Sequence, residues 1–128
     1  MKKIVFVCIE NSNRSQMAQA FANMYGKEKI MAFSAGSSPS GKINPKAIAA
    51  MQEIGYDLST HQSKSITDIP FDTYDYVVTM GCGDNCPHLP AKKRIDWQIP
   101  DPKNMNENEF RKVRDLIAEK VKELFQTF

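Results

Sequence analysis

The stretch that decides the fold is residues 3–18, KIVFVCIENSNRSQMA, where a mostly apolar run leads through a polar loop into a segment with helical spacing. The run from Lys3 to Val7 is typical of a strand that is buried on both faces of a sheet. Residues Glu10 to Arg14 are polar, and beyond them apolar side chains recur with helical spacing from Met17 to Met24. The stretch therefore predicts a strand, a loop and a helix, and Gly26 is a suitable end for that helix.

The rest of the chain repeats this alternation of strands and helices. Asn44-Pro45 is a good helix start, because an N-cap residue precedes proline at the first helical position, and Gly55 ends that helix. The last helix carries acidic residues in its first turn, where the helix dipole favours them. We predict strands at Ile30–Ser34, Tyr76–Met80 and around Arg94–Trp97, a helix from Pro45 with an apolar face of Ala47, Ile48, Met51 and Ile54, and a helix at Glu107–Phe125.

Strands that alternate with helices imply parallel βαβ units. We therefore predict one α/β domain over residues 1–128, with a four-stranded parallel sheet and helices on both faces. In such folds ligands bind beyond the carboxyl ends of the strands. Cys8 and Cys82 each follow a predicted strand, so we expect them to face the same crevice although they are far apart in sequence.

Composition limits the class of protein. The chain has 128 residues, of which 41% are hydrophobic and 25% charged, as in an ordinary soluble domain. A net charge of +2 with interspersed signs argues against nucleic acid as a main partner. No run approaches the ~18 apolar residues of a membrane span, and the first apolar run is too short for a signal peptide. We expect a cytoplasmic monomer whose three cysteines cannot all pair with one another.

The first loop has the features of an oxyanion site. Backbone N–H groups between a strand and a helix can turn inward and bind an anion, aided by the helix dipole. Arg14 supplies a planar fork for two oxygens, and its charge favours the thiolate form of Cys8, although a lone cysteine is more often simply buried. We expect Ser15 to donate to the Cys8 sulfur and to cap the helix. The expected oxyanion-binding loop comprises Ile9, Glu10, Asn11, Ser12, Asn13 and Arg14.

The pattern Cys8-x5-Arg14-Ser15, which runs into Gln16-Met17-Ala18, resembles the low-molecular-weight protein tyrosine phosphatase family and, within it, the arsenate reductases. The resemblance implies that Cys8 is the nucleophile, Arg14 the oxyanion clamp and Asn11 the organiser of the loop. It extends over nearly the whole chain, through Ser34-Ala35-Gly36, Asn44-Pro45-Lys46-Ala47, the Cys82 region, Asp101-Pro102 and the final helix.

Cys82 and Cys86 lie in the segment GCGDNCP, residues 81–87, after the third predicted strand. Half of a zinc site is one alternative, but Cys8, His61 and His88 are the only further candidates and form no second close pair. Another alternative is that Cys82 and Cys86 are two ordinary loop thiols. The interpretation we favour is a relay in which Cys82 attacks a Cys8–arsenate adduct and Cys86 then resolves the Cys8–Cys82 disulfide.

The resemblance implies thioredoxin as the external reductant. Cys82 and Cys86 are closer together than is usual in thioredoxin-coupled arsenate reductases. It therefore stays open at this point whether Cys86 or a low-molecular-weight thiol resolves the first disulfide. Phosphate and sulfate are expected to act as mimics of arsenate in the loop.

Asp101 lies between Pro100 and Pro102, which stiffen the backbone on both sides. By the resemblance it is the general acid that protonates the leaving oxygen, whereas the plain alternative is a solvated turn residue. Trp97 and at least one of Tyr74 and Tyr76 are expected in the core, and His61 and His88 on the surface.

No bound cofactor or metal is predicted. Some thioredoxin-linked relatives bind potassium through side-chain oxygens, and the matching positions here are Asn11, Gln19, Ser34 and Lys64. A neutral glutamine and a cationic lysine do not suit a cation, so we predict that the Lys64 ammonium occupies that space.

The sequence thus favours an arsenate reductase, a thiol-dependent oxidoreductase of arsenic detoxification. One alternative is a phosphomonoesterase of the same family that uses Cys8, Arg14 and Asp101, and which does not need the other two cysteines. Another is a non-catalytic redox sensor in which Cys82 and Cys86 are reversibly oxidised.

Overall fold

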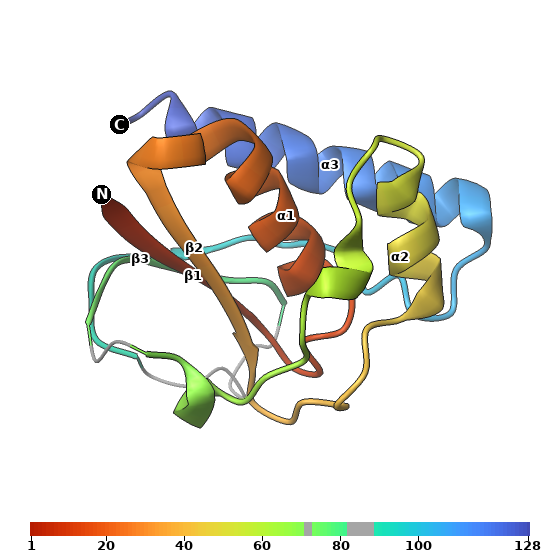
Figure 1. The fold of residues 1–128 in the computed structure, drawn as a ribbon, viewed down its shortest axis with the longest axis horizontal. Coiled ribbons are helices and arrows are strands. Elements are labelled where there is room, and N and C mark those ends of the chain that lie inside the picture. Colours follow the sequence, from red (N-terminus) through yellow and green to blue (C-terminus); the bar gives the residue numbers. More distant parts are fainter. Residues whose placement is uncertain (71–72, 82–88) are drawn as a thin grey trace.

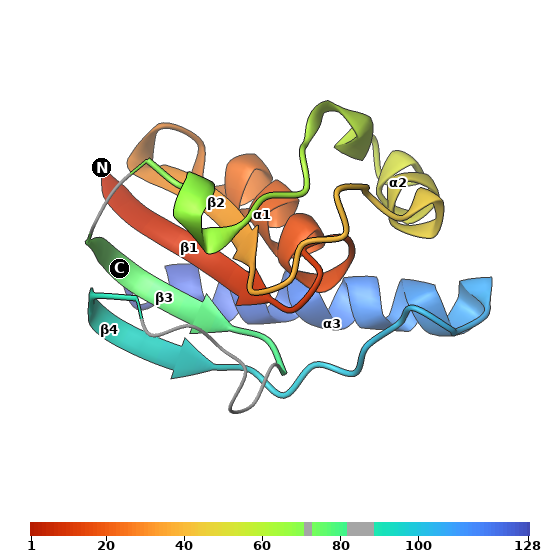
Figure 2. The ribbon, with the colours of Figure 1, turned by 90° about the horizontal axis from the view of Figure 1, so that it is seen from below.

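The computed structural model describes residues 1–70, 73–81 and 89–128, and its centre is a four-stranded sheet. The strands are β1 (Lys2–Cys8), β2 (Ile30–Gly36), β3 (Tyr74–Thr79) and β4 (Ala91–Asp96). They are all parallel and lie in the order β2-β1-β3-β4. Figure 2 shows the strands pointing the same way, with the chain leaving β1, β2 and β4 at one edge of the sheet.

The α-helices are α1 (Arg14–Gly26), α2 (Pro45–Gln52) and α3 (Glu107–Phe125), and Figure 1 shows α3 running along the side of the domain behind α1 and α2. Asparagine caps two of them, because Asn44 accepts a hydrogen bond from the Lys46 N–H and Asn106 accepts one from the Glu109 N–H. Three short 3-10 helices are described as well, namely η1 (Lys27–Lys29), η2 (Leu58–Thr60) and η3 (Ile66–Asp68).

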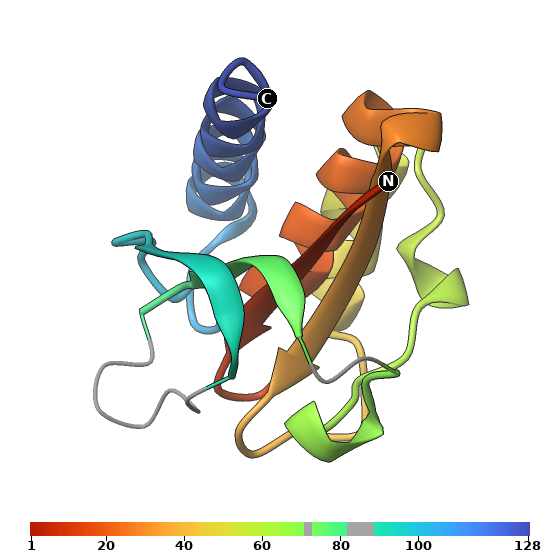
Figure 3. The same ribbon diagram turned by 90° about the vertical axis from the view of Figure 1, so that its left-hand side faces the viewer.

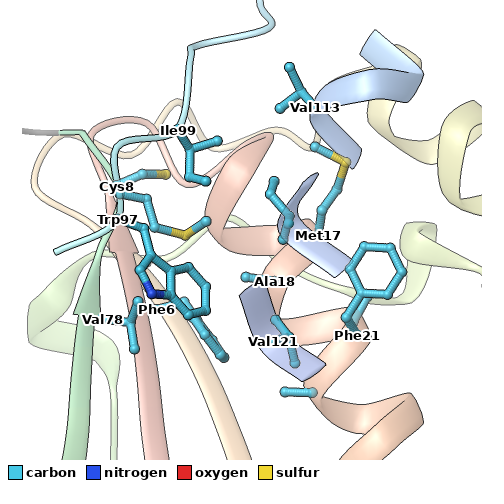
Figure 4. Packing of buried hydrophobic residues seen from close by; sticks show 14 of the residues in the cluster. Phe6, Cys8, Met17, Ala18, Phe21, Val78, Trp97, Ile99, Val113 and Val121 are labelled. Carbon is cyan, nitrogen blue, oxygen red and sulfur yellow. The ribbon is translucent and has the colours of Figure 1, made fainter. Parts of the chain in front are cut away.

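The main core lies between one face of the sheet and the α-helices. Phe6, Val78 and Trp97 meet Met17 and Phe21 of α1 there, and residues of α2 and α3 complete the same cluster (Figure 4). The rings of Phe6 and Trp97 are 5.9 Å apart, so the expected burial of Trp97 is confirmed.

The second face of the sheet carries a smaller core. Val5 and Val77 pack there with Ile66, Ile69 and Leu89. We expected helices on both faces; in the described part of the chain, η3 and its neighbours cover this face, while α1 and α3 lie together on the other (Figure 3).

The predicted fold class is confirmed, with differences in detail. Ile54 is exposed and lies beyond the end of α2, so its expected place on the apolar face of that helix is wrong; Ala50 is buried instead. Tyr74 is buried, as expected for one of the two tyrosines. Among the described residues, no helix is both long enough and apolar enough to cross a membrane.

Candidate active site

Cys8 is the last residue of β1 and Arg14 the first residue of α1, so residues 9–13 connect the carboxyl end of a central strand to a helix N-terminus. The Cys8 side chain is almost fully buried, and its backbone lies opposite Gly36 of β2. Gly36 has to be glycine, because a Cβ atom there would lie 2.5 Å from the Ile9 carbonyl oxygen. The neighbouring strand therefore presses directly against the loop.

Asn11 organises the loop. Its backbone is left-handed, with a φ of 51°, a conformation that asparagine tolerates better than most residues. Its amide nitrogen donates to Ser15 Oγ at 2.7 Å. Its amide oxygen accepts hydrogen bonds from the Lys64 backbone N–H at 2.7 Å and from Gln16 Nε2 at 2.8 Å. The side chain thus joins both ends of the loop to the segment around Lys64.

Ser15 contacts the sulfur of Cys8. The Cys8 Sγ and Ser15 Oγ atoms are 2.8 Å apart, and Ser15 Oγ also accepts the hydrogen bond from Asn11. Its own hydroxyl proton is therefore available to the sulfur. The expected capping role is wrong, because α1 begins at Arg14 and Ser15 lies inside its first turn.

The Arg14 side chain is buried, and neighbouring residues hold its guanidinium in place. Nη1 donates to the Ile99 carbonyl oxygen at 3.1 Å, and Nη2 lies 3.9 Å from a carboxylate oxygen of Asp101. Gly81, with a φ of +82°, leaves room for the guanidinium, since a Cβ there would lie 2.6 Å from Nη1. The contact with Asp101 is too long for a paired fork, so the guanidinium retains donors for an anion.

A pocket of about 360 Å³ opens beside these groups. Cys8, Arg14 and Asp101 all line it, so three of the side chains predicted from sequence do come together. The Asp101 carboxylate is half exposed and accepts a hydrogen bond from the Lys103 backbone N–H at 3.1 Å. The other lining residues are Ile9, Glu10, Ser12, Asn13, Ser38 and Lys103. Cys82, Cys86 and His88 lie outside the described residues.

Two of these lining residues, Ser38 and Lys103, are not predicted by the sequence. Ser38 lies in the pocket lining because its backbone N–H donates to the Ile9 carbonyl oxygen at 2.8 Å. Lys103 lies there because its ammonium is 3.1 Å from the Glu10 carboxylate. The only signal in the sequence was the position of Lys103 two residues after Asp101, which does not reveal its partner.

His61 is partly buried and bonded at both ring nitrogens, so it is not the plain surface residue that was predicted. Its Nδ1 lies 2.9 Å from Gln16 Oε1 and its Nε2 lies 2.6 Å from the Tyr56 hydroxyl. Since an amide oxygen only accepts, Nδ1 carries the proton and Nε2 accepts from Tyr56. Burial lowers the pKa of His61, and the nearby charge of Lys64 lowers it further. The histidine thus supports Gln16, which in turn holds Asn11.

The positions matched to a potassium site are engaged in protein contacts. The Ser34 hydroxyl donates to Gln19 Oε1 at 2.7 Å, and the Asn11 oxygen is occupied as described above. Within the described ranges, no group of three or more histidine, cysteine, aspartate or glutamate side chains is placed to hold a metal ion. The proposed place of the Lys64 ammonium stays a prediction.

The cysteine at the end of the first strand, the buried arginine at the start of the first helix and the carboxylate across the pocket have the arrangement expected of a phosphatase-like oxyanion site on an α/β fold. The chain belongs to the low-molecular-weight phosphotyrosine protein phosphatase family, whose model matches residues 3–128.

Relatives within this family bear the name arsenate reductase. The chain is 42% identical over 127 residues to the glutaredoxin arsenate reductase of Synechocystis sp., covering 97% of this chain and 96% of that protein. An arsenate reductase solved in a phosphate-binding state superposes with a TM-score of 0.88 at 40% identity, covering 99% of this chain and 98% of the other. A thioredoxin-dependent arsenate reductase from Corynebacterium glutamicum gives a TM-score of 0.80 at 30% identity, covering 99% of this chain and 61% of the other. The sequence resemblance to arsenate reductases of this family is thereby confirmed.

Proposed function

We propose that this protein is an arsenate reductase that converts arsenate to arsenite through a covalent adduct with Cys8. The observation that carries the proposal is the meeting of the Cys8 sulfur, the Arg14 guanidinium and the Asp101 carboxylate around one pocket at the carboxyl end of the sheet. The names and structures of the relatives support arsenate as the oxyanion.

In the first step arsenate binds in the loop, where backbone N–H groups of residues 9–14 and the fork of Arg14 bind its oxygens. The Cys8 sulfur, with Ser15 as hydrogen-bond donor, attacks arsenic. Asp101 gives a proton to the leaving oxygen, which departs as water. The 3.9 Å separation between its carboxylate and Arg14 Nη2 supports this role.

In the second step Cys82 attacks the Cys8 sulfur. A Cys8–Cys82 disulfide forms, the sulfur–arsenic bond breaks, and its electron pair reduces arsenic from the +5 to the +3 state, so that arsenite leaves. Cys86 then attacks Cys82, which frees Cys8 and leaves a Cys82–Cys86 disulfide. The three cysteines of the sequence match this scheme, and no thiol is left over.

The cycle closes when an external thiol reduces the disulfide. The names of relatives offer both glutaredoxin and thioredoxin as reductants, and a low-molecular-weight thiol can replace Cys86 as the resolving group. All of these reductants operate in a reducing compartment, so we propose that the protein acts in the cytoplasm. We also propose that it acts as a monomer.

A second activity uses the same groups. Phosphate has the shape and charge of arsenate, and hydrolysis of a phosphate monoester needs Cys8, Arg14 and Asp101 but neither of the other cysteines. The lining of the pocket by these three residues, together with the family match, favours residual phosphatase activity.

The proposal is tested by arsenate-dependent consumption of NADPH, coupled either to thioredoxin and its reductase or to glutaredoxin, glutathione and glutathione reductase. Wild type is compared with Cys8→Ser, Cys82→Ser and Cys86→Ser, and hydrolysis of p-nitrophenyl phosphate is measured in parallel. We expect Cys8→Ser to abolish both activities and Cys82→Ser to abolish only reduction. Absence of arsenate-dependent consumption by the wild type in either system would refute the proposal.

A further inference from the structure

An ion pair forms part of the lining of the pocket. The Lys103 ammonium lies 3.1 Å from the carboxylate of Glu10, a residue of the oxyanion-binding loop. Both residues line the pocket together with Cys8 and Asp101, and both side chains are partly exposed. The pair therefore connects two segments of the pocket lining that are distant in sequence.

The same lysine also holds Asp101. Its backbone N–H donates to one carboxylate oxygen of Asp101, while the other oxygen is only within 3.9 Å of Arg14. Lys103 thus holds the carboxylate through its backbone and the loop through its side chain. Other contacts of the segment lie at its ends and at Pro102: Ile99 accepts from Arg14, Met105 accepts from the Lys46 ammonium, and the Met105 N–H donates to the carbonyl oxygen of the buried Pro102.

The ion pair also affects the charge of the pocket, because Glu10 is negatively charged. Its carboxylate stands beside a pocket that would receive an anion, and like charges repel. The Lys103 ammonium offsets that charge while leaving the Glu10 backbone in the loop, where its carbonyl oxygen accepts hydrogen bonds from the Ser40 N–H and the Ser63 hydroxyl.

We propose that Glu10 and Lys103 form a latch that positions Asp101 over the oxyanion pocket and cancels the charge of Glu10 beside the bound anion. Both are positioning residues, since they act through Asp101 and through the field in the pocket. This inference rests on the proposed function, because it assigns the latch to the same pocket and the same proton donor.

Three variants separate the two effects. In Lys103→Met the latch opens and Glu10 is left unpaired, so both phosphate affinity and kcat/KM for arsenate fall, each by about two- to fivefold, the range of an exposed ion pair. In Lys103→Met/Glu10→Gln the repulsion is gone but the latch stays open, so phosphate affinity returns to the wild-type value while kcat/KM remains low. Lys103→Arg keeps the pair and retains both quantities.

The test combines phosphate titration by calorimetry, kcat/KM for arsenate, which reports adduct formation, and amide hydrogen exchange of residues 99–105 in the reduced full-length protein. We expect faster exchange of this segment in Lys103→Met and wild-type exchange in Lys103→Arg. Unchanged exchange together with unchanged phosphate affinity in Lys103→Met would overturn the latch.

Exchange and phosphate affinity need no turnover, so the latch is judged even if wild type does not reduce arsenate. That second result would refute only the proposed function. Equal losses of kcat/KM in Lys103→Met and Lys103→Arg would also overturn the latch, because the pair is kept in the arginine variant.

Discussion

Gly81→Ala would disturb the arginine clamp without touching Arg14 itself. A Cβ at position 81 would lie 2.6 Å from Arg14 Nη1 and 3.3 Å from the Ile99 carbonyl oxygen. To restore an ordinary van der Waals separation, the guanidinium has to retreat by about 1 Å. A misplacement of that size in a positioning group can cost about 10²-fold in rate. Because Gly81 has a φ of +82°, alanine also costs about 1–2 kcal/mol of folding free energy.

Gly55→Ala is the matched control for this experiment. Gly55 has a φ of +85°, and no described atom lies within 4 Å of the Cβ that alanine would add. Both variants should therefore lose a similar free energy of unfolding, about 1–2 kcal/mol in urea titrations. Only Gly81→Ala should bind phosphate more weakly and reduce arsenate more slowly, with a loss of about 10- to 100-fold in kcat/KM.

The reasoning would be refuted if folded Gly81→Ala bound phosphate as tightly as Gly55→Ala and reduced arsenate as fast. Such a result would mean that the guanidinium has space to move aside and that its position is not set by the segment after β3. A loss of phosphate affinity in Gly55→Ala as well would assign the effect to stability and not to Arg14.

Three other contacts can be tested by substitution or titration. Asn11→Gly keeps the left-handed backbone but removes the side chain that bonds to the Lys64 N–H, to Gln16 and to Ser15. The free energy of unfolding in urea should therefore fall by about 2–4 kcal/mol. A change too small to measure would contradict the role of Asn11. Because burial lowers the pKa of His61 in the folded state, the unfolded chain takes up its proton first as the pH falls below about 6.5, so stability should be full above that pH and decline below it. His61→Asn should lack this part of the decline when urea midpoints are compared on either side of that pH, and an identical pH dependence would argue against it. Hydrogen bonds from Arg111 and Arg114 lower the pKa of Glu53 from 4.5 to about 2. A carbon NMR titration of Glu53 should therefore have its midpoint near 2 in wild type and closer to 4.5 in Arg111→Gln. A midpoint that stays near 2 in the variant would exclude Arg111 as the main cause.

Local patterns in the sequence predict most of the fold. The apolar run before Cys8, the Asn44-Pro45 cap and the amphipathic pattern of the last helix each depend on neighbouring residues, and each corresponds to an observed element. The elements that cover each face of the sheet are harder to predict from the sequence, because a 3-10 helix such as η3 has too few residues to show a periodic pattern. Ile54 was misplaced for a related reason, since the helix ends at Gln52, two residues before the apolar pattern does.

The site divides in the same way. Cys8 and Arg14 are indicated by a motif at a strand end, which is a local signal, whereas Asp101 was singled out by the family resemblance. The contacts of His61 with Gln16 and of Lys103 with Glu10 join segments that nothing in the sequence pairs, so they appear only once the chain is folded. Ser15 was expected both to donate to the Cys8 sulfur and to cap the helix; its hydroxyl does lie 2.8 Å from the sulfur, but the residue lies inside the first turn of α1 and is not the cap.

The central claim is that the cysteine thiols supply the two electrons that reduce arsenic, and that the resulting disulfide passes from Cys8–Cys82 to Cys82–Cys86. It is tested most directly by mixing reduced protein with arsenate in the absence of any reductant, blocking free thiols and mapping disulfides by mass spectrometry. The account predicts a Cys82–Cys86 disulfide with free Cys8 in wild type, a trapped Cys8–Cys82 disulfide in Cys86→Ser, and one arsenite released per protein in both. Arsenite released by Cys82→Ser in the same amount, or no disulfide in wild type, would contradict it.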